Sequence, residues 1–295
     1  MKAKKSLGQN FLKSEVALRQ IIEAGEIKPD DIVLEIGPGK GALTEKLLEK
    51  ANTVVAVEKD YELIFFLKEK FAEQIKSGIL ILIQGDILEF NISETVLKNT
   101  LEVRSADFSL RGVSQADGPR GNAPRARGDS DPARKESVDL ERYKIIANIP
   151  YNITGAILKK FLTEKNQPEM MVLMVQHEVA TRILARNGKE SILSVSVKAY
   201  GEPKMVAKVD KRYFSPAPKV NSAIIAIKNI SRQTFKENEV DEEKFWEIVK
   251  KGFAHKRKKL SGNLKDICQK ESLIPYANKR AEDLTLEDWI VLSRG

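Results

Sequence analysis

The sequence predicts an α/β protein with a doubly wound, mostly parallel sheet and a small helical region at its C-terminal end. Short apolar runs alternate with helical patterns along the first part of the chain, which is the arrangement of βαβ units. The runs lie at residues 32–34, 53–57, 79–83 and 143–147. The runs are mostly apolar, as expected for strands that are covered on both faces.

Helical patterns separate these runs. Ser14 is suited to cap a helix that ends at Gly25. The expected apolar face of this helix consists of Val16, Leu18, Ile21 and Ile22. A long amphipathic helix is expected over residues 61–75, before Gly78.

The last part of the chain has a different pattern. Residues 240–260 have helical spacing, and no strand pattern follows them. We therefore expect an α/β domain over residues 1–230 and a helical domain over residues 231–295.

An atypical segment interrupts the α/β pattern between about residues 99 and 140. It is rich in Gly, Pro, Ser and Asp, and it uses arginine where the rest of the chain favours lysine: Arg104, Arg111, Arg120, Arg125, Arg127 and Arg134. Such a composition buries too little apolar surface to offset the entropy of ordering, which predicts a disordered insertion. An RNA-binding arm is one interpretation. A tolerated surface insertion is favoured, because four aspartates partly cancel the charge.

Composition narrows the functional classes. Of 295 residues, 42% are hydrophobic and 31% charged, which is typical of a soluble globular protein. No apolar run approaches the roughly 20 residues that cross a bilayer, and no signal peptide is evident. Cys268 is the only cysteine, so a cytoplasmic protein without disulfides is expected, and with His177 and His255 far apart no metal site is expected. The net charge of +8 suggests a polyanionic partner.

A glycine-rich loop follows the first predicted strand. Residues 35–41 read Glu-Ile-Gly-Pro-Gly-Lys-Gly, and Gly37 and Gly39 allow a tight turn and a close approach of the backbone to a ligand. A dinucleotide site prefers Gly-x-Gly-x-x-Gly, with a helix N-terminus aimed at a pyrophosphate. Here the third glycine comes one residue early and Glu35 precedes the loop. This pattern favours the cationic cofactor S-adenosylmethionine, with a plain structural turn as the alternative.

Two carboxylates follow at successive strand ends. Glu58 ends the second run and can accept both ribose hydroxyls, while Asp86 follows the third and can accept from the adenine amine. Each carboxylate alone is more often a helix cap or a solvated loop residue, but the two occur at successive strand ends. Ligands of open α/β sheets bind at the carboxyl ends of the strands, which favours a nucleoside site here.

Residues 148–151 (Asn-Ile-Pro-Tyr) follow the fourth strand and form the most specific motif. The exocyclic amine of adenine is a poor nucleophile, and two acceptors on its hydrogens make the nitrogen more tetrahedral. Asn148 and a backbone carbonyl that Pro150 holds rigid would supply them, and Tyr151 would stack on the base. The motif predicts in-line methyl transfer to an adenine N6, with an Asn-Pro turn as the alternative.

Two further features bear on nucleic acid. Phe214, in a proline-rich loop, is expected either to stack on the other face of a flipped base or to be a core aromatic. A basic run is expected to extend a helix and contact phosphates, or to be a solvated face. It contains Lys256, Arg257, Lys258 and Lys259.

With these residues assembled, the chain resembles the small-subunit ribosomal RNA adenine N6,N6-dimethyltransferases from about Leu7 to Trp289. Seven blocks carry the resemblance: residues 7–12 (Leu-Gly-Gln-Asn-Phe-Leu), 35–44, 57–60, 85–86, 148–154, 214–222 and 280–284. The resemblance implies that Asn10 and Leu12 contact the cofactor from the N-terminal segment. It implies as substrate two adjacent adenosines in the hairpin loop near the 3′ end of small-subunit rRNA, each methylated twice.

The resemblance also implies action on an immature 30S subunit during ribosome maturation, and we expect a monomer without a membrane or metal partner. The chain departs from the family pattern at residues 188–195, where a Tyr-Ser pair is usual, and at Gly262, where an asparagine is usual. Two alternatives remain: a large-subunit rRNA adenine methyltransferase of the antibiotic-resistance type, and a non-catalytic RNA-binding assembly factor.

Overall fold

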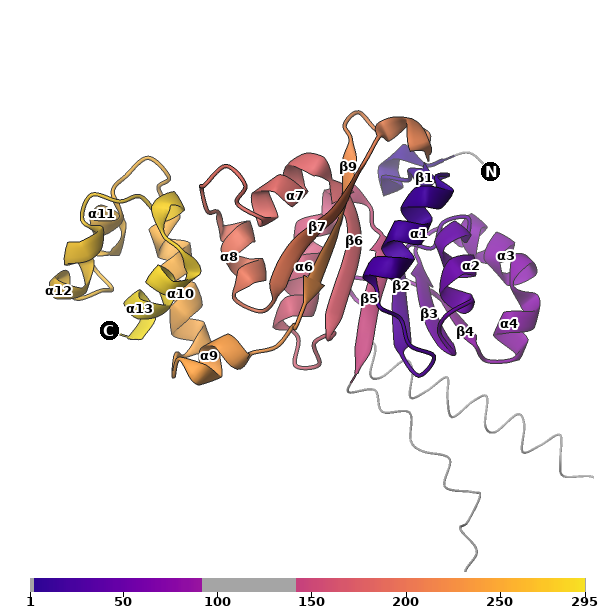
Figure 1. The fold of residues 1–295 in the computed structure, drawn as a ribbon, viewed down its shortest axis with the longest axis horizontal. Coiled ribbons are helices and arrows are strands. Elements are labelled where there is room, and N and C mark those ends of the chain that lie inside the picture. Colours follow the sequence, from indigo (N-terminus) through magenta and orange to yellow (C-terminus); the bar gives the residue numbers. More distant parts are fainter. Residues whose placement is uncertain (1–2, 92–141, 295) are drawn as a thin grey trace, which may run out of the picture.

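A seven-stranded sheet forms the centre of the computed structural model, which describes residues 3–91 and 142–294 (Figure 1). The strand order is β4-β3-β2-β5-β6-β9-β7. Five strands are parallel, and β9 is antiparallel to both of its neighbours. The strands are β2 (Ile32–Ile36), β3 (Thr53–Glu58), β4 (Leu80–Gln84), β5 (Tyr143–Asn148), β6 (Met170–Gln176), β7 (Glu202–Val209) and β9 (Ser222–Lys228).

The α/β prediction is confirmed, and all four predicted strands are present. The sequence interpretation did not identify β6, β7 and β9. The predicted insertion over about residues 99–140 lies outside the described residues.

Two apolar layers cover the sheet. Helices α1 (Glu15–Ala24) and α2 (Ala42–Leu48) pack on one face, and α6 (Thr154–Thr163), α7 (His177–Ile183) and α8 (Ile192–Lys198) on the other. Side chains alternate between the layers along each strand. Val33, for example, joins the α1 layer and Leu34 the opposite one.

The structure confirms most of what the sequence predicted for the first helix, α1. The Ser14 hydroxyl accepts from the amide of Ala17 at 3.2 Å, and Gly25 is the C-cap residue. Leu18 and Ile21 are buried. The assignment of Val16 to the apolar face is wrong, because its side chain is 63% exposed.

The predicted helix over residues 61–75 is two helices, α3 (Tyr61–Lys70) and α4 (Ala72–Lys76). The break falls at Phe71, whose backbone leaves helical geometry with φ −113° and ψ 30°. The Phe71 ring packs against Gly41, where a Cβ atom would lie 2.5 Å from it. A close tertiary contact, which the local pattern does not encode, accompanies this break.

The C-terminal region is helical, as predicted. It contains α9 (Gln233–Glu237), α10 (Glu242–Gly252), α11 (Leu260–Leu264), α12 (Lys270–Leu273) and α13 (Leu286–Arg294). Its aromatic residues continue the apolar layer of α8: Tyr200 stacks with Trp246, with ring centroids 6.1 Å apart. The domain boundary near residue 230 stays a prediction.

The expected helix over residues 240–260 is too long. Helix α10 ends at Gly252, so the basic residues 256–259 lie in the loop before α11 and not on a helix. Asn263 closes the helix end, because its Nδ2 donates to the Gly252 carbonyl at 2.6 Å. Gly252 is itself required by Trp289, since a Cβ atom there would lie 2.4 Å from the indole ring.

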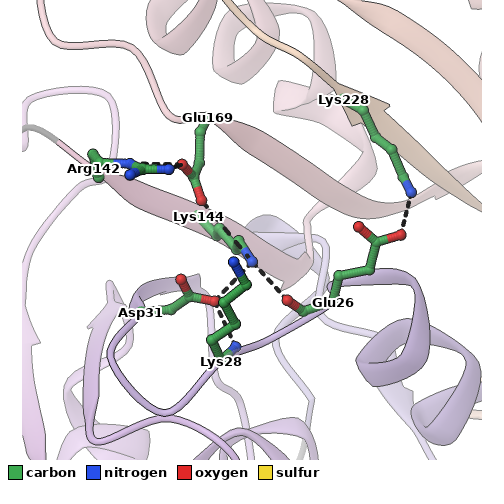
Figure 2. A network of polar contacts seen from close by, with 7 residues as sticks. All are labelled: Glu26, Lys28, Asp31, Arg142, Lys144, Glu169 and Lys228. Atoms are coloured by element: carbon green, nitrogen blue, oxygen red, sulfur yellow. Dashed lines mark hydrogen bonds and ion pairs between the residues drawn. The ribbon is translucent and has the colours of Figure 1, made fainter.

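A polar network fixes the amino-terminal end of β5 (Figure 2). Lys144 is 5% exposed, and its ammonium lies 2.7 Å from the Asp31 carboxylate and 2.8 Å from the Glu26 carbonyl oxygen. The Glu169 carboxylate joins the network through the Lys144 ammonium, 4.0 Å from its Oε1, and the Arg142 guanidinium pairs with Glu169 Oε2 at 3.0 Å. Removing one member of such a buried pair leaves an uncompensated charge and is strongly destabilising. The network therefore joins the start of β5 to the α1–β2 connection.

We predict that Gly252→Ala lowers the free energy of unfolding by about 1–3 kcal/mol, because the new methyl group overlaps the rigid Trp289 ring. Gly155→Ala is the matched control in α6, where a Cβ atom meets nothing within 4 Å, and it should stabilise by about 0.4–1 kcal/mol. Urea unfolding of both variants measures this. Equal stability of the two variants would contradict the packing argument.

We predict that deletion of residues 101–138 leaves cofactor affinity within a few-fold, because the Lys144 network holds the start of β5 through residues outside that segment. Calorimetric titration with S-adenosylmethionine checks this. Lys144→Met in the full-length chain removes the network while keeping the segment. It should lower the urea midpoint, because Asp31 loses its buried partner. A collapse of cofactor binding in the deletion variant alone would show that the segment is integral to the site.

Candidate functional site

The carboxyl ends of four parallel strands meet at a cavity of about 600 Å³. The loops after β2, β3, β4 and β5 line it, together with residues 6–13 of the N-terminal segment. Nine residues that the sequence singled out lie in its wall: Asn10, Leu12, Gly37, Gly39, Glu58, Asp86, Asn148, Pro150 and Tyr151. The structure thus brings together the predicted cofactor and target motifs.

The glycine-rich loop has the backbone geometry that its composition predicts. Gly37 and Gly39 have φ values of +66° and +60°, which favour glycine. The Gly37 amide donates to the Val57 carbonyl at 2.9 Å, which ties the loop to β3. A Cβ atom on Gly39 would lie 3.0 Å from the Phe11 ring, so this glycine lets the N-terminal segment approach.

Glu58 is held firmly at the end of β3. One carboxylate oxygen accepts from the Gly39 amide at 3.1 Å and the other from the Asp60 amide at 2.8 Å. Burial raises the pKa of Glu58 above its ordinary value. Each oxygen retains a lone pair, so the carboxylate is oriented and can still accept from a ligand hydroxyl.

Asp86 lies at the end of β4 as an ionised acceptor. The Lys59 ammonium is 2.7 Å from its Oδ2, and the Leu88 amide donates to Oδ1 at 3.0 Å. These bonds hold the pKa of Asp86 below its usual range, Lys59 being the larger cause. The carboxylate can therefore accept from an amine at the cavity wall.

The sequence interpretation gave no role to the Glu35 side chain. It is 1% exposed, and Oε2 accepts from the Thr44 hydroxyl at 2.6 Å. Burial raises the pKa of Glu35 to about 8, so the carboxyl group holds a proton at neutral pH. The acidic residue before the glycine loop was noted as a pattern, but its burial depends on the packing of α2.

The N-terminal segment is held at both ends. Asp60 accepts from the Lys4 ammonium and from the Gln9 side-chain amide, each at 2.7 Å. At the other end β1 (Phe11–Leu12) pairs antiparallel with β8 (Phe214–Ser215). Gln9 and Asp60, which position this segment, were not among the site residues expected from the sequence, although both fall within blocks of the resemblance. Their contact is between distant segments and has no local signal.

Asn148 joins the N-terminal segment to the target motif. Its Nδ2 donates to the Asn10 carbonyl at 3.2 Å, which leaves Oδ1 as the group that can accept from a substrate amine. The Tyr151 hydroxyl lies 2.5 Å from the Ser222 hydroxyl at the start of β9. Burial raises the pKa of Tyr151, so it stays a neutral phenol.

Phe214 occupies a different place from the other predicted site residues. Its side chain is 2% exposed, packs in the α1 layer and does not line the cavity. The neighbouring Tyr213 is 40% exposed. Stacking of Phe214 on a base stays a prediction, and in this conformation its ring is enclosed.

The two departures from the family pattern lie in different surroundings. Lys189 forms ion pairs with Asp283 and Glu282, and the Glu190 amide donates to the Glu282 carbonyl at 2.8 Å. Residues 188–190 therefore contact the C-terminal region. A Cβ atom at Gly262 would meet nothing within 4 Å, so a side chain there is tolerated.

The predicted phosphate-binding residues 256–259 are exposed in the α10–α11 loop and lie outside the cavity. Within the described residues, no cluster of three or more His, Cys, Asp or Glu side chains is placed to bind a metal ion. Over the same residues, no helix combines the length and apolarity needed to cross a membrane.

The sheet order, with a cavity at the carboxyl edge of the parallel strands, defines a Rossmann-like fold of the methyltransferase type. Two solved structures share this fold. One is the 23S rRNA methyltransferase ErmE, with a TM-score of 0.67 and 23% identity over 97% of this chain and 98% of that one. The other is a dimethyladenosine transferase from Plasmodium falciparum, with a TM-score of 0.68 and 24% identity. The match covers 96% of this chain and 95% of that one.

Sequence comparison then identifies the family. Residues 1–291 match the family described as Ribosomal RNA adenine dimethylase. The chain is 36% identical over 298 residues to "Ribosomal RNA small subunit methyltransferase A" of Dehalococcoides mccartyi strain CBDB1, covering 98% of this chain and 87% of that protein. The protein of the same name from Rippkaea orientalis is 34% identical over 304 residues, which cover 98% of this chain and 96% of that protein. The chain belongs to the ribosomal RNA adenine dimethylase family, which confirms the resemblance.

We predict that Glu35 makes the free energy of unfolding fall as the pH rises from about 4.5 to about 8. The pKa of this group is about 8 in the folded protein against 4.5 ordinarily, so the folded state holds a proton that the unfolded chain releases. Glu35→Gln should remove this contribution, so its urea midpoint relative to wild type should rise with pH across that window. Exposed Glu73→Gln is the control. A pH-independent difference between Glu35→Gln and wild type would contradict the buried, protonated assignment.

Proposed function

We propose that the protein uses S-adenosylmethionine to dimethylate N6 of two adjacent adenosines in the hairpin loop near the 3′ end of small-subunit rRNA. One observation carries this proposal: the Asn148–Tyr151 motif and the two strand-end carboxylates line the same cavity. Family membership and the names of the relatives support an rRNA adenine as the acceptor. We place the reaction on an immature 30S subunit, in the cytoplasm, by a monomeric enzyme without a metal.

The residues present fit the cofactor. Glu58 and Asp86 offer oriented acceptors for ribose hydroxyls and an adenine amine, and the positive-φ glycines let the ligand approach the loop. Asn10 and Leu12 would close the site from the N-terminal side. When bound, S-adenosylmethionine supplies an electrophilic methyl group on a cationic sulfur.

The target motif activates the amine by position. We propose that Asn148 Oδ1 accepts one amine hydrogen and a backbone carbonyl the other. The Pro150 carbonyl already accepts from the Ile153 amide at 3.3 Å, which favours the Ile149 carbonyl as the second acceptor. Both bonds strengthen as the nitrogen becomes cationic during transfer, so they stabilise the transition state more than the ground state.

Tyr151 would supply one face of the base pocket. Its hydroxyl is held by Ser222, which fixes the ring beside Pro150. Stacking on an aromatic ring is worth about 1–3 kcal/mol per base. Phe214 is proposed for the opposite face, which requires its enclosed ring to move toward the cavity.

We propose that the α/β domain over residues 1–230 binds cofactor and catalyses transfer, and that the helical domain over 231–295 binds RNA through Lys256, Arg257, Lys258 and Lys259. These four residues are exposed, and a basic loop suits phosphate contacts. Incubation with labelled cofactor and immature small subunits, followed by mapping of the modified nucleotides, tests the whole proposal. Label in large-subunit rRNA only would favour the antibiotic-resistance alternative, and no transfer would favour the assembly factor.

We predict that Asn148→Ala lowers kcat by at least about 100-fold, in the range of losing one positioned transition-state hydrogen bond. The affinity for rRNA should remain within about twofold, because Asn148 touches the amine and not the phosphates. Single-turnover methylation and filter binding measure the two quantities. Asn152→Ala, an exposed asparagine in the same wall, is the control, and an equal loss of kcat and affinity in Asn148→Ala would contradict the assignment.

A further inference from the structure

We infer that Gln9 is a positioning residue for methyl transfer, because it holds the Asn10 carbonyl that orients the side-chain amide of Asn148. Gln9 is itself anchored on Asp60 and acts through Asn148, without touching the reacting atoms. The inference rests on the proposed function, since it concerns the acceptor that Asn148 offers to the target amine. It adds Gln9 and Asp60 to the residues on which the rate of transfer depends.

The side chain of Asn148 has two unlike ends, and only one of them can accept from an amine. Its Nδ2 donates to the Asn10 carbonyl at 3.2 Å. A carbonyl oxygen only accepts, so this contact selects the orientation in which Nδ2 faces the N-terminal segment and Oδ1 is left for the substrate. A rotated amide would set two oxygens against each other and turn a donor toward the target amine. The position of the Asn10 carbonyl therefore decides what Asn148 offers.

The Gln9 side chain fixes the backbone next to that carbonyl. Its Nε2 donates to Asp60 Oδ2 and its Oε1 accepts from the Lys4 amide, each at 2.7 Å. Asp60 is a firm anchor, because it is 4% exposed and its own amide donates to Glu58 at 2.8 Å, at the end of β3. Both ends of the Gln9 side chain thus have partners in the protein, one residue before the carbonyl that meets Asn148.

The chain on either side leaves the Asn10 carbonyl little freedom. After it, Phe11 pairs with Ser215, where β1 meets β8. Before it, a Cβ atom on Gly8 would lie 3.5 Å from the Pro150 side chain, so the segment passes directly against the target motif. Among these attachments, the Gln9 side chain is the one that a substitution can remove while the strand pairing and the close backbone packing are kept.

The first experiment reverses the donor and the acceptor of the bond between Gln9 and Asp60. Gln9→Glu removes the donor and sets two carboxylates together, so it should lower the single-turnover rate of methylation about 10-fold, within the range of coupling inside one hydrogen-bond network. Adding Asp60→Asn supplies a donor at the place of Oδ2 and should restore the rate to within about threefold. Oδ1, which holds Lys4 at 2.7 Å and the Glu62 amide at 3.0 Å, keeps its role in that variant. The rate is measured with labelled S-adenosylmethionine at saturation and immature small subunits.

A double-mutant cycle separates positioning from a merely structural role. Gln9→Ala should lower the same rate about 10-fold in the wild-type background and less than about twofold in Asn148→Ala, because it acts only through that amide. Calorimetric affinity for S-adenosylmethionine and the urea midpoint should stay close to those of the wild type. Glu62→Gln is the matched control and should leave the rate unchanged, because this exposed carboxylate pairs with Lys4 at 3.0 Å on the solvent side of the same anchor.

Equal losses of rate for Gln9→Ala in the two backgrounds would overturn the inference, as would a reversed pair that stays as slow as Gln9→Glu. A loss of cofactor affinity that matches the loss of rate would also overturn it, since Gln9 would then only hold the cofactor side of the segment. Failure of the proposed function has a different signature: wild-type protein, with Gln9 intact, would leave the small subunits unmethylated.

Discussion

The parallel pairing of β2 with both β3 and β5 is the constraint on which the site depends. It brings the glycine loop after β2, Glu58 at the end of β3 and Asn148 at the end of β5 to one edge of the sheet. Parallel strands with helical crossovers leave all their carboxyl ends on the same side, so residues far apart in sequence share one cavity. The buried Lys144 network at the opposite edge holds β5 in this arrangement.

The N-terminal segment completes the cavity and couples its two halves. Asp60 holds this segment near the cofactor carboxylates, and pairing of β1 with β8 holds it near the target loop. The bond from Asn148 to Asn10 lies between these two attachments. The N-terminal segment therefore joins the two halves of the cavity by hydrogen bonds, in addition to the central sheet.

Charge is used differently inside and outside the cavity. Glu35 is buried and protonated, while Asp86 is kept ionised by Lys59. On the surface, lysines and arginines are exposed at the cavity rim, on α7 and in the α10–α11 loop. Burial thus keeps Glu35 protonated and the Lys59 ammonium keeps Asp86 ionised, whereas exposure leaves surface cations available to a polyanion.

The α/β class, four of the strands, the first helix and the motifs at the strand ends could be predicted from the sequence, because periodicity and strand-end residues are local signals. The family resemblance could be recognised there too. The break at Phe71 in the helix after Tyr61, the position of the basic run outside α10 and the enclosure of Phe214 became evident only in the folded chain. Each depends on contacts between distant segments, such as Phe71 on Gly41 and Trp289 on Gly252, which leave no periodic trace in the sequence.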